Sequence, residues 1–300
     1  FLIENYINKK ISSLEDEVSK FVNKARFKYN NNYYNYNSFV SIITNEPNKN
    51  KRLEIFNSFK KILNKVTKIR QKIFKKLIEE FNYLGYSYFE YYKTFKQIDY
   101  FKLLESLKFF LRATDKPYKN ALNNYLKKYN LNLKNINNLD FSYVGKVAID
   151  QKYLPKENLL PCILNFLNNL DIDIKKQKNI VLDLEDRKNK VPRPFTNLLK
   201  IPSDIRVMIK PIGGFMDYRG LLHEFGHAEH YSHVNPDLEF EFGELHRGYA
   251  TTETYAALFE FLLSNPRFIH RHIKVDEKGI KQIINFSYIY RFYLIRRYIG

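Results

Sequence analysis

The chain has 300 residues, a formal net charge of +18 at neutral pH and a single cysteine. This length suits one large domain or two modest ones with a substantial core. The lone Cys162 excludes an internal disulfide framework and a cysteine-based zinc site, so we expect a reducing, cytoplasmic setting. No run approaches the roughly 18 consecutive apolar residues that a membrane-spanning helix needs, so we expect no membrane partner.

The positive charge does not by itself predict a nucleic-acid partner. Lys and Asn are abundant throughout, as AT-rich coding sequences produce, and the charge is unevenly placed. Between Leu221 and Leu263, Arg247 is opposed by eight acids, namely Glu224, Glu229, Asp237, Glu239, Glu241, Glu244, Glu253 and Glu260. The basic excess lies elsewhere, where lysines fill the solvated faces of helices, so we do not expect nucleic acid as a partner.

The first half of the chain carries the periodicity of helices. Apolar residues at helical spacing predict helices over residues 1–29 and 53–81, the second ended by Gly85. The stretches Asn30–Asn37 and Thr44–Asn50 break this pattern, so we expect loops there. Shorter helices are predicted at Phe89–Phe95, Asp99–Leu111, Tyr118–Tyr129 and Pro155–Leu170.

The pattern changes after Asp171. The apolar run Ile180–Leu184 predicts a strand, and the alternation over Ile205–Lys210 predicts a half-buried one. A stiff connection at Val191–Pro194 separates them, and Asp217 is placed to cap the helix that follows. We therefore predict a mainly α protein with a small β-sheet, divided into a helical N-terminal region, 1–140, and a catalytic region, 141–300.

Residues 223–227 read His-Glu-Phe-Gly-His, the most informative segment of the chain. Histidines four apart on a helix lie on one face, so His223 and His227 can reach one Zn²⁺ ion. Glu224 then lies beside the open metal position, where a carboxylate can act as the catalytic base. The alternative is an amphipathic helix that carries two histidines by chance.

Catalytic zinc takes three protein ligands, and the sequence offers two kinds of third ligand. His233 has the spacing of a three-histidine motif, but that motif needs glycine at 230, and His230 stands there. The better candidate is Glu253, on a predicted helix that runs from Ala250 to Glu260. If Glu253 is the ligand, its carboxylate should lie within about 3–4 Å of both imidazoles, because zinc–ligand bonds are near 2 Å.

Further acids and one histidine surround these candidates. Glu260 lies seven residues after Glu253, on the same helix face, and is predicted to accept the free N–H of a ligand histidine. His230 is predicted to support the site or to pack beside it, without binding the metal. Glu241 and Glu244 alternate with apolar residues and are expected to be solvated.

The motif and its downstream glutamates resemble the thimet oligopeptidase and oligoendopeptidase F family of zinc peptidases. The resemblance is carried by Leu221–His230, then by Glu253 at 26 residues after His227, and by Glu260 seven further on. It is strong over about residues 180–265 and loose elsewhere. It implies a helical zincin-like fold, one Zn²⁺ per chain held by His223, His227 and Glu253, and short peptides as substrates.

Two departures from the family pattern stand out. The family commonly has Ser three residues after the ligand glutamate, where this chain has Ala256. The histidine and tyrosines that stabilise the transition state in the family would fall after Gly300. The chain starts at Phe1 and stops inside an apolar, helix-like run, so we expect a piece of a longer protein.

The expected function is a zinc-dependent peptidase in which Glu224 is the base. The predicted strand, with Ile205, Arg206, Val207, Met208 and Ile209, is a candidate to pair with an extended peptide substrate. Two alternatives stay open: a basic helical protein that binds nucleic acid through its lysines, with an accidental or decayed motif, and a chain that binds zinc but is inert.

Overall fold

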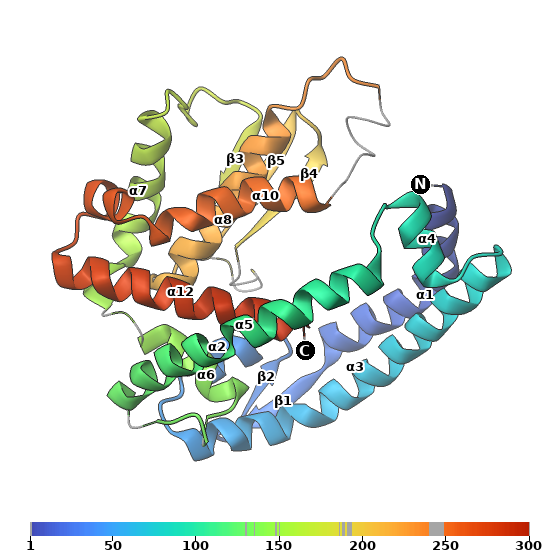
Figure 1. The fold of residues 1–300 in the computed structure, drawn as a ribbon, viewed down its shortest axis with the longest axis horizontal. Coiled ribbons are helices and arrows are strands. Elements are labelled where there is room, and N and C mark those ends of the chain that lie inside the picture. Colours follow the sequence, from blue (N-terminus) through green and yellow to red (C-terminus); the bar gives the residue numbers. More distant parts are fainter. Residues whose placement is uncertain are drawn as a thin grey trace. The chain divides into compact units, whose positions relative to one another are not determined.

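A computed structural model shows a mostly helical protein, with one three-stranded sheet and one hairpin among the residues that it describes (Figure 1). The mainly α class with a small sheet is thereby confirmed. The structure describes residues 2–129, 131–134, 136–147, 149, 151–185, 187, 190, 194–239 and 249–299. The connection predicted at Val191–Pro194 lies, apart from Pro194, outside the described residues.

The chain forms two compact units. The first comprises Phe1–Tyr143 and Ile295–Gly300, and the second comprises Val144–Leu294. Helices α6 (Asn138–Val147) and α12 (Glu277–Ile299) each run from one unit into the other. The division of the chain into domains at 140/141 stays a prediction, because compactness alone does not test independent folding.

The first unit begins with helix α1 (Leu2–Lys24), which ends earlier than the predicted boundary at residue 29. Strands β1 (Arg26–Tyr29) and β2 (Asn32–Asn35) follow, where a helix end and a loop were expected. Asn30 and Asn31 have φ of +48° and +59°, which a two-residue hairpin turn requires and which asparagine tolerates. The buried Phe27 anchors the hairpin against Phe59 of helix α3 (Lys49–Tyr83).

Helix α3 is the longest element of the first unit, and α1 packs along it. The Asn48 side chain caps it by accepting hydrogen bonds from the backbone N–H groups of Asn50 and Lys51. Its predicted apolar stripe faces the core: Ile55, Phe59, Ile62, Val66 and Ile69 are buried, while the last two members, Ile73 and Leu77, are half-buried. This part of the chain contains α2 (Ser38–Asn45), α3 (Lys49–Tyr83), α4 (Tyr88–Phe95) and α5 (Tyr100–Leu126).

Helix α5 is a single helix, where the sequence predicted two. Pro117 lies inside it, where a proline removes one helical hydrogen bond and crowds the preceding turn, at a cost of about 3 kcal/mol. Burial of Leu122, Tyr125 and Leu126 stabilises the turns beyond the proline. The chain then passes through a 3₁₀ turn, η1 (Lys127–Tyr129), to α6, which the sequence did not predict.

The sheet of the second unit has the strand order β3-β5-β4. Strand β5 pairs in parallel with β3 and antiparallel with β4. The predicted alternation in β5 is confirmed, because Ile205 and Val207 are fully buried while Arg206 is exposed. The strands are β3 (Ile180–Asp183), β4 (Phe195–Lys200) and β5 (Asp204–Met208), of which β4 was not predicted.

Helix α8 packs against β4 and β5 and against helix α10, so it lies between the sheet and a second helix. Leu221, Leu222 and Phe225 of α8 have no exposed surface. The helical segments of this unit are η2 (Gln151–Tyr153), α7 (Lys156–Asn168), α8 (Phe215–Ser232), α10 (Tyr249–Glu260), η3 (Phe261–Ser264), α11 (Pro266–Phe268), η4 (Ile269–Ile273) and α12. The predicted motif helix and the predicted helix at 250–260 are thus both present and packed together.

Candidate metal centre

The turn before α8 sets the direction of the motif helix. Gly213 and Gly214 have φ of +91° and +86°, a region that side chains disfavour, and Gly214 is the N-cap residue. The prediction that Asp217 caps the helix was wrong, because α8 begins two residues earlier, at Phe215. The Asp217 carboxylate instead accepts the backbone N–H groups of Ile212 (2.5 Å) and Gly213 (2.8 Å) and so holds the turn.

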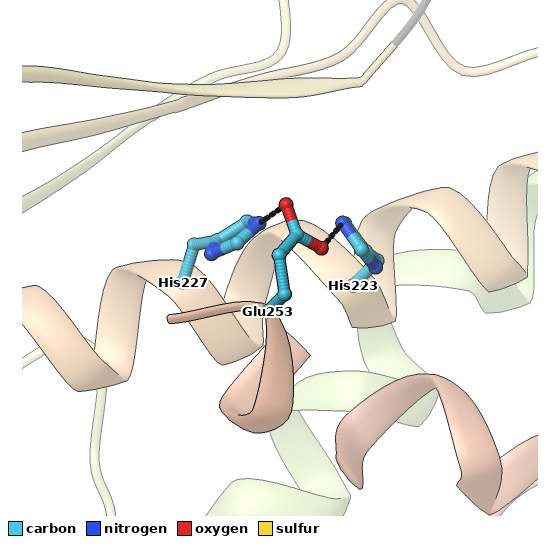
Figure 2. Close-up of side chains that lie close together, drawn as sticks. All are labelled: His223, His227 and Glu253. Carbon is cyan, nitrogen blue, oxygen red and sulfur yellow. Dashed lines mark ion pairs between the residues drawn. The ribbon is translucent and has the colours of Figure 1, made fainter. Parts of the chain in front are cut away.

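His223 and His227 lie one turn apart on α8, with ring centroids 4.8 Å apart, and Glu253 approaches them from α10 (Figure 2). One carboxylate oxygen of Glu253 lies 3.5 Å from Nε2 of His223, and the other lies 3.8 Å from Nε2 of His227. One donor atom from each residue falls within 4.8 Å of the others. The Glu253 carboxylate therefore lies within the expected 3–4 Å of both imidazoles, and the three predicted ligands converge within 4.8 Å as a set.

Gly226 makes this convergence possible. A Cβ atom at this position would lie 2.5 Å from the carbonyl oxygen of Tyr255 and 2.6 Å from Cα of Ala256. Glycine between the histidines therefore lets the backbone of α10 approach α8 closely. Ala256, where the resembled family commonly has Ser, is fully buried at this contact.

The Nδ1 atom of His223 is hydrogen-bonded to Glu260. His223 Nδ1 lies 3.1 Å from Oε2 of Glu260, and because an ionised carboxylate only accepts, Nδ1 carries the proton. Arg219 binds the same carboxylate with two hydrogen bonds of 2.9 and 2.8 Å. Burial raises the pKa of Glu260, but the His223 hydrogen bond and the Arg219 charge outweigh burial and leave the pKa below its ordinary value. The arrangement leaves Nε2 of His223 free to face Glu253.

The Nδ1 atom of His227 is hydrogen-bonded to Thr252. His227 Nδ1 lies 2.7 Å from the hydroxyl oxygen of Thr252, a side chain that is 5% exposed. Sequence reasoning missed this residue, because nothing in the pattern marks a threonine beside a ligand glutamate. It also missed the role of Arg219, although a position four residues before His223 on the same helix face was a usable signal.

Burial and neighbouring charges shift the pKa values of the two histidines in opposite directions. Burial, followed by the charges of His223 and His230, lowers the pKa of His227 to about 4. Burial also disfavours charged His223, but the Glu260 hydrogen bond and the Glu224 charge raise its pKa above the ordinary value. Burial raises the pKa of Glu224, with a smaller contribution from Glu253. A raised pKa suits a carboxylate that must both accept and return a proton near neutrality.

The other histidines of α8 do not join the cluster. The ring of His230 stacks on Tyr255, with centroids 4.5 Å apart and an interplanar angle of 10°, so it packs where α8 and α10 meet. His233, the alternative third ligand, lies at the C-terminal end of α8 and contacts the carbonyl oxygen of Glu229 at 2.8 Å. Glu241 and Glu244 lie outside the described residues.

The structure does not favour the strand predicted to pair with substrate. Strand β5 is central in the sheet, and Ile205–Met208 pair on both sides, so their backbone offers no open edge. Among the described residues, β4 pairs only with β5 and is an edge strand. The Thr196 hydroxyl of β4 donates to the carbonyl oxygen of Glu224 (2.9 Å), which ties this edge strand to the motif.

The chain was compared with family models and with curated proteins, and neither comparison found a match. The family resemblance therefore stays a prediction that rests on the motif and its spacing. No helix within the described ranges is both long and apolar enough to cross a membrane.

Proposed function

We propose that this chain carries the zinc-binding catalytic centre of a metallopeptidase. The single observation that supports this most strongly is the convergence of His223 and His227 of α8 with Glu253 of α10, which lies 26 residues after His227 along the chain. Glu224, in the position of the catalytic base, lies beside the first of these histidines.

The donor set fits a zinc ion. Bonds of about 2.0–2.2 Å in a tetrahedral arrangement separate neighbouring donor atoms by about 3.4 Å. The two imidazole–carboxylate separations are 3.5 and 3.8 Å, too long for hydrogen bonds and close to this spacing. Glu260 and Thr252 occupy both Nδ1 atoms, which fixes each ring with Nε2 toward Glu253. Two imidazoles and one carboxylate also suit zinc better than the hard cations Mg²⁺ and Ca²⁺.

The chain's own residues then divide the work of hydrolysis. A bound zinc ion would polarise the scissile carbonyl and lower the pKa of a coordinated water toward neutrality. Glu224, whose pKa burial raises, accepts the proton of the attacking water and delivers it to the leaving amine. Glu260 and Arg219 hold His223 in one tautomer and one orientation throughout.

The open edge of β4 is the better candidate to bind an extended substrate. An edge strand pairs with the main chain of a peptide and reads few side chains, so selectivity would be broad. We further propose a zincin-like fold of the thimet oligopeptidase and oligoendopeptidase F type, with short peptides as substrates. The lone, buried Cys162 is the support for a cytoplasmic enzyme.

The test is to measure zinc content and peptide cleavage on the same preparation. The wild-type chain should hold one zinc ion and cleave unstructured peptides. His227→Ala should lose both properties, whereas His233→Ala, at the end of the same helix, should keep them. A wild-type chain without zinc affinity, or a His227→Ala variant that still cleaves, would refute the proposal. Zinc binding without cleavage would retain the metal site and refute the peptidase.

A further inference from the structure

The two compact units differ sharply in charge. The first unit holds 29 Lys and Arg against 13 Asp and Glu, a net charge of +16, while the second holds 21 against 19, a net charge of +2. Both units belong to one chain, so a compositional bias of the coding sequence toward lysine would affect both units alike. Such a bias does not explain the difference in net charge between them. The basic excess is a property of the first unit.

Part of this charge forms an ordered row on α3. Lys61, Lys65, Lys68, Lys72 and Lys75 are spaced by four, three, four and three residues, which places them along one face. All five are exposed. At 1.5 Å per residue the row is about 21 Å long. We call these five residues the lysine row.

Acids on α3 lie only beyond the two ends of the lysine row. Glu54 precedes Lys61 by seven residues and Glu79 follows Lys75 by four, both on the same face. Between these two glutamates, α3 carries eight basic residues and no acid. The positive face is therefore continuous along the row.

Most of the lysine row is without an ionic partner among the residues that the structure describes. Lys65 lies over the Phe21 ring, with Nζ 4.6 Å from the centroid. Lys61, Lys68, Lys72 and Lys75 make no ion pair with any described residue. Lys76, just outside the row, differs because it pairs with Glu80 at 2.7 Å. Four positive charges in a line, held on a rigid helix, are thus available to an external anion.

The neighbours of the lysine row distinguish between classes of anionic partner. The exposed residues three or four positions from these lysines are Asn57, Asn64, Gln71 and Glu79, and none is apolar. A helix that lies in a membrane surface pairs its basic face with apolar residues that enter the lipid, and this face offers none. Amides beside lysines, by contrast, are typical donors to phosphate oxygens.

From this arrangement we infer that the lysine row binds the phosphate backbone of a nucleic acid, without reading its sequence. This departs from the expectation that the lysines only fill solvated helix faces, because the structure concentrates the charge in one unit and aligns part of it. Five lysines over about 21 Å span about six nucleotides of one strand of a duplex, at 3.4 Å per step. The inference is independent of the proposed peptidase, which uses residues of the second unit.

The experiment measures binding of a fluorescent 20-base-pair DNA duplex to the whole chain between 50 and 200 mM NaCl. Five phosphate contacts predict that log K falls with log[salt] with a slope of about −4 to −5. Replacing Lys61, Lys68, Lys72 and Lys75 with Gln should reduce this slope by about 3–4 and weaken binding at 100 mM salt by at least about 100-fold. The matched control replaces Lys102, Lys108, Lys116 and Lys127 with Gln, since these lysines are exposed in the same unit but outside α3.

The control removes the same charge and should weaken binding less than about 5-fold, with a smaller change of slope. Circular dichroism and zinc affinity should match the wild type in both variants, since Lys and Gln have similar helix propensity. Equal losses in the two variants would overturn the inference in favour of attraction by net charge alone. Absence of duplex binding, with or without binding to vesicles that contain phosphatidylserine, would overturn it as well.

Discussion

The two compact units place their charged side chains in opposite ways. In the second unit, the charges near the motif are partly buried and partnered: Arg219 binds Glu260, which in turn binds His223. In the first unit, the lysine row is exposed and largely without partners. Burial strengthens the effect of each neighbouring group on the pKa of a charged side chain, so the second unit suits chemistry at a single site. Exposure leaves charges independent, so the first unit suits association with an extended partner.

The largest expected effect tests the chemical role of the second unit. Glu224→Gln keeps the size of the side chain but removes the base, so peptide cleavage should fall by about 10²–10⁴-fold. Zinc affinity should be unchanged, because Glu224 is not among the three converging ligands. Glu239→Gln, an exposed acid beyond α8, is the control and should leave cleavage unchanged. A Glu224→Gln variant as active as the control would exclude Glu224 as the base.

The first unit also contains buried charged residues, among them an ion pair that allows a stability test. Arg52 and Asp140 are 2% and 0% exposed and form an ion pair at 2.6 Å, which joins α3 to α6. Arg52→Met would leave the Asp140 charge buried without its main partner, at a cost of about 3–5 kcal/mol in the free energy of unfolding. Arg70→Met, on the exposed part of the same helix, should change stability by less than about 0.5 kcal/mol. Similar unfolding midpoints in urea for the two variants would contradict the contrast between buried and exposed charge.

The pH dependence of the metal-free chain tests the half-buried histidines of the second unit, His223 and His227. The pKa of His227 is lowered to about 4, so the unfolded chain binds this proton more readily than the folded chain between about pH 6.5 and 4. Stability should therefore fall as pH drops through that window, by up to about 3 kcal/mol from this group. The raised pKa of His223 has the opposite sign, since its contribution is present at acid pH and is lost as pH rises through its folded value.

The measurement is the free energy of unfolding in urea between pH 7 and 4, with zinc removed by a chelator. His227→Gln should flatten the wild-type dependence in this window. A histidine NMR titration should show that His227 stays neutral to about pH 4. An unchanged pH dependence in His227→Gln would show that burial does not hold this ring neutral.

The sequence predicted those features that one helix determines by itself. Four-residue spacing places His223 and His227 on one face wherever the helix lies, and seven-residue spacing does the same for Glu253 and Glu260. Long apolar stripes likewise predicted α3 correctly. In each case, the period of the helix converts positions in the sequence directly into geometry.

Features that depend on contacts between elements escaped prediction. The hairpin was missed because Asn30–Asn37 offers no apolar run, and its strands are stabilised by packing of Phe27 on α3. Strand β4 was missed, and β5 was predicted to pair with substrate although it is central in the sheet, because pairing partners are not visible in the alternation of one strand. Gly226 shows the same limit, since its importance lies in how closely α10 approaches.

Substitution of Thr252 tests whether a side-chain contact of this kind orients a histidine of the metal centre. Its hydroxyl holds Nδ1 of His227 at 2.7 Å, as Glu260 holds Nδ1 of His223. Thr252→Val keeps the shape but removes this partner, so the His227 ring loses its fixed orientation. Zinc affinity, measured by competition with a chelator at fixed pH, should fall by about 10–100-fold. Thr252→Ser should restore most of it, because serine keeps the hydroxyl.

Thr254→Val is the matched control. Thr254 lies on the same helix and is exposed. Among the described contacts, its hydroxyl donates a hydrogen bond only to the Ala250 carbonyl, so removal of this hydroxyl should leave zinc affinity unchanged. If Thr252→Val and Thr254→Val bind zinc equally well, the threonine at 252 is a packing residue and His227 is oriented by burial alone. If zinc affinity falls only in Thr252→Val and serine restores it, a hydrogen-bond partner orients each of the two histidines. The side chains of the metal centre are then held by their neighbours, whereas most lysines of the lysine row have no such partner.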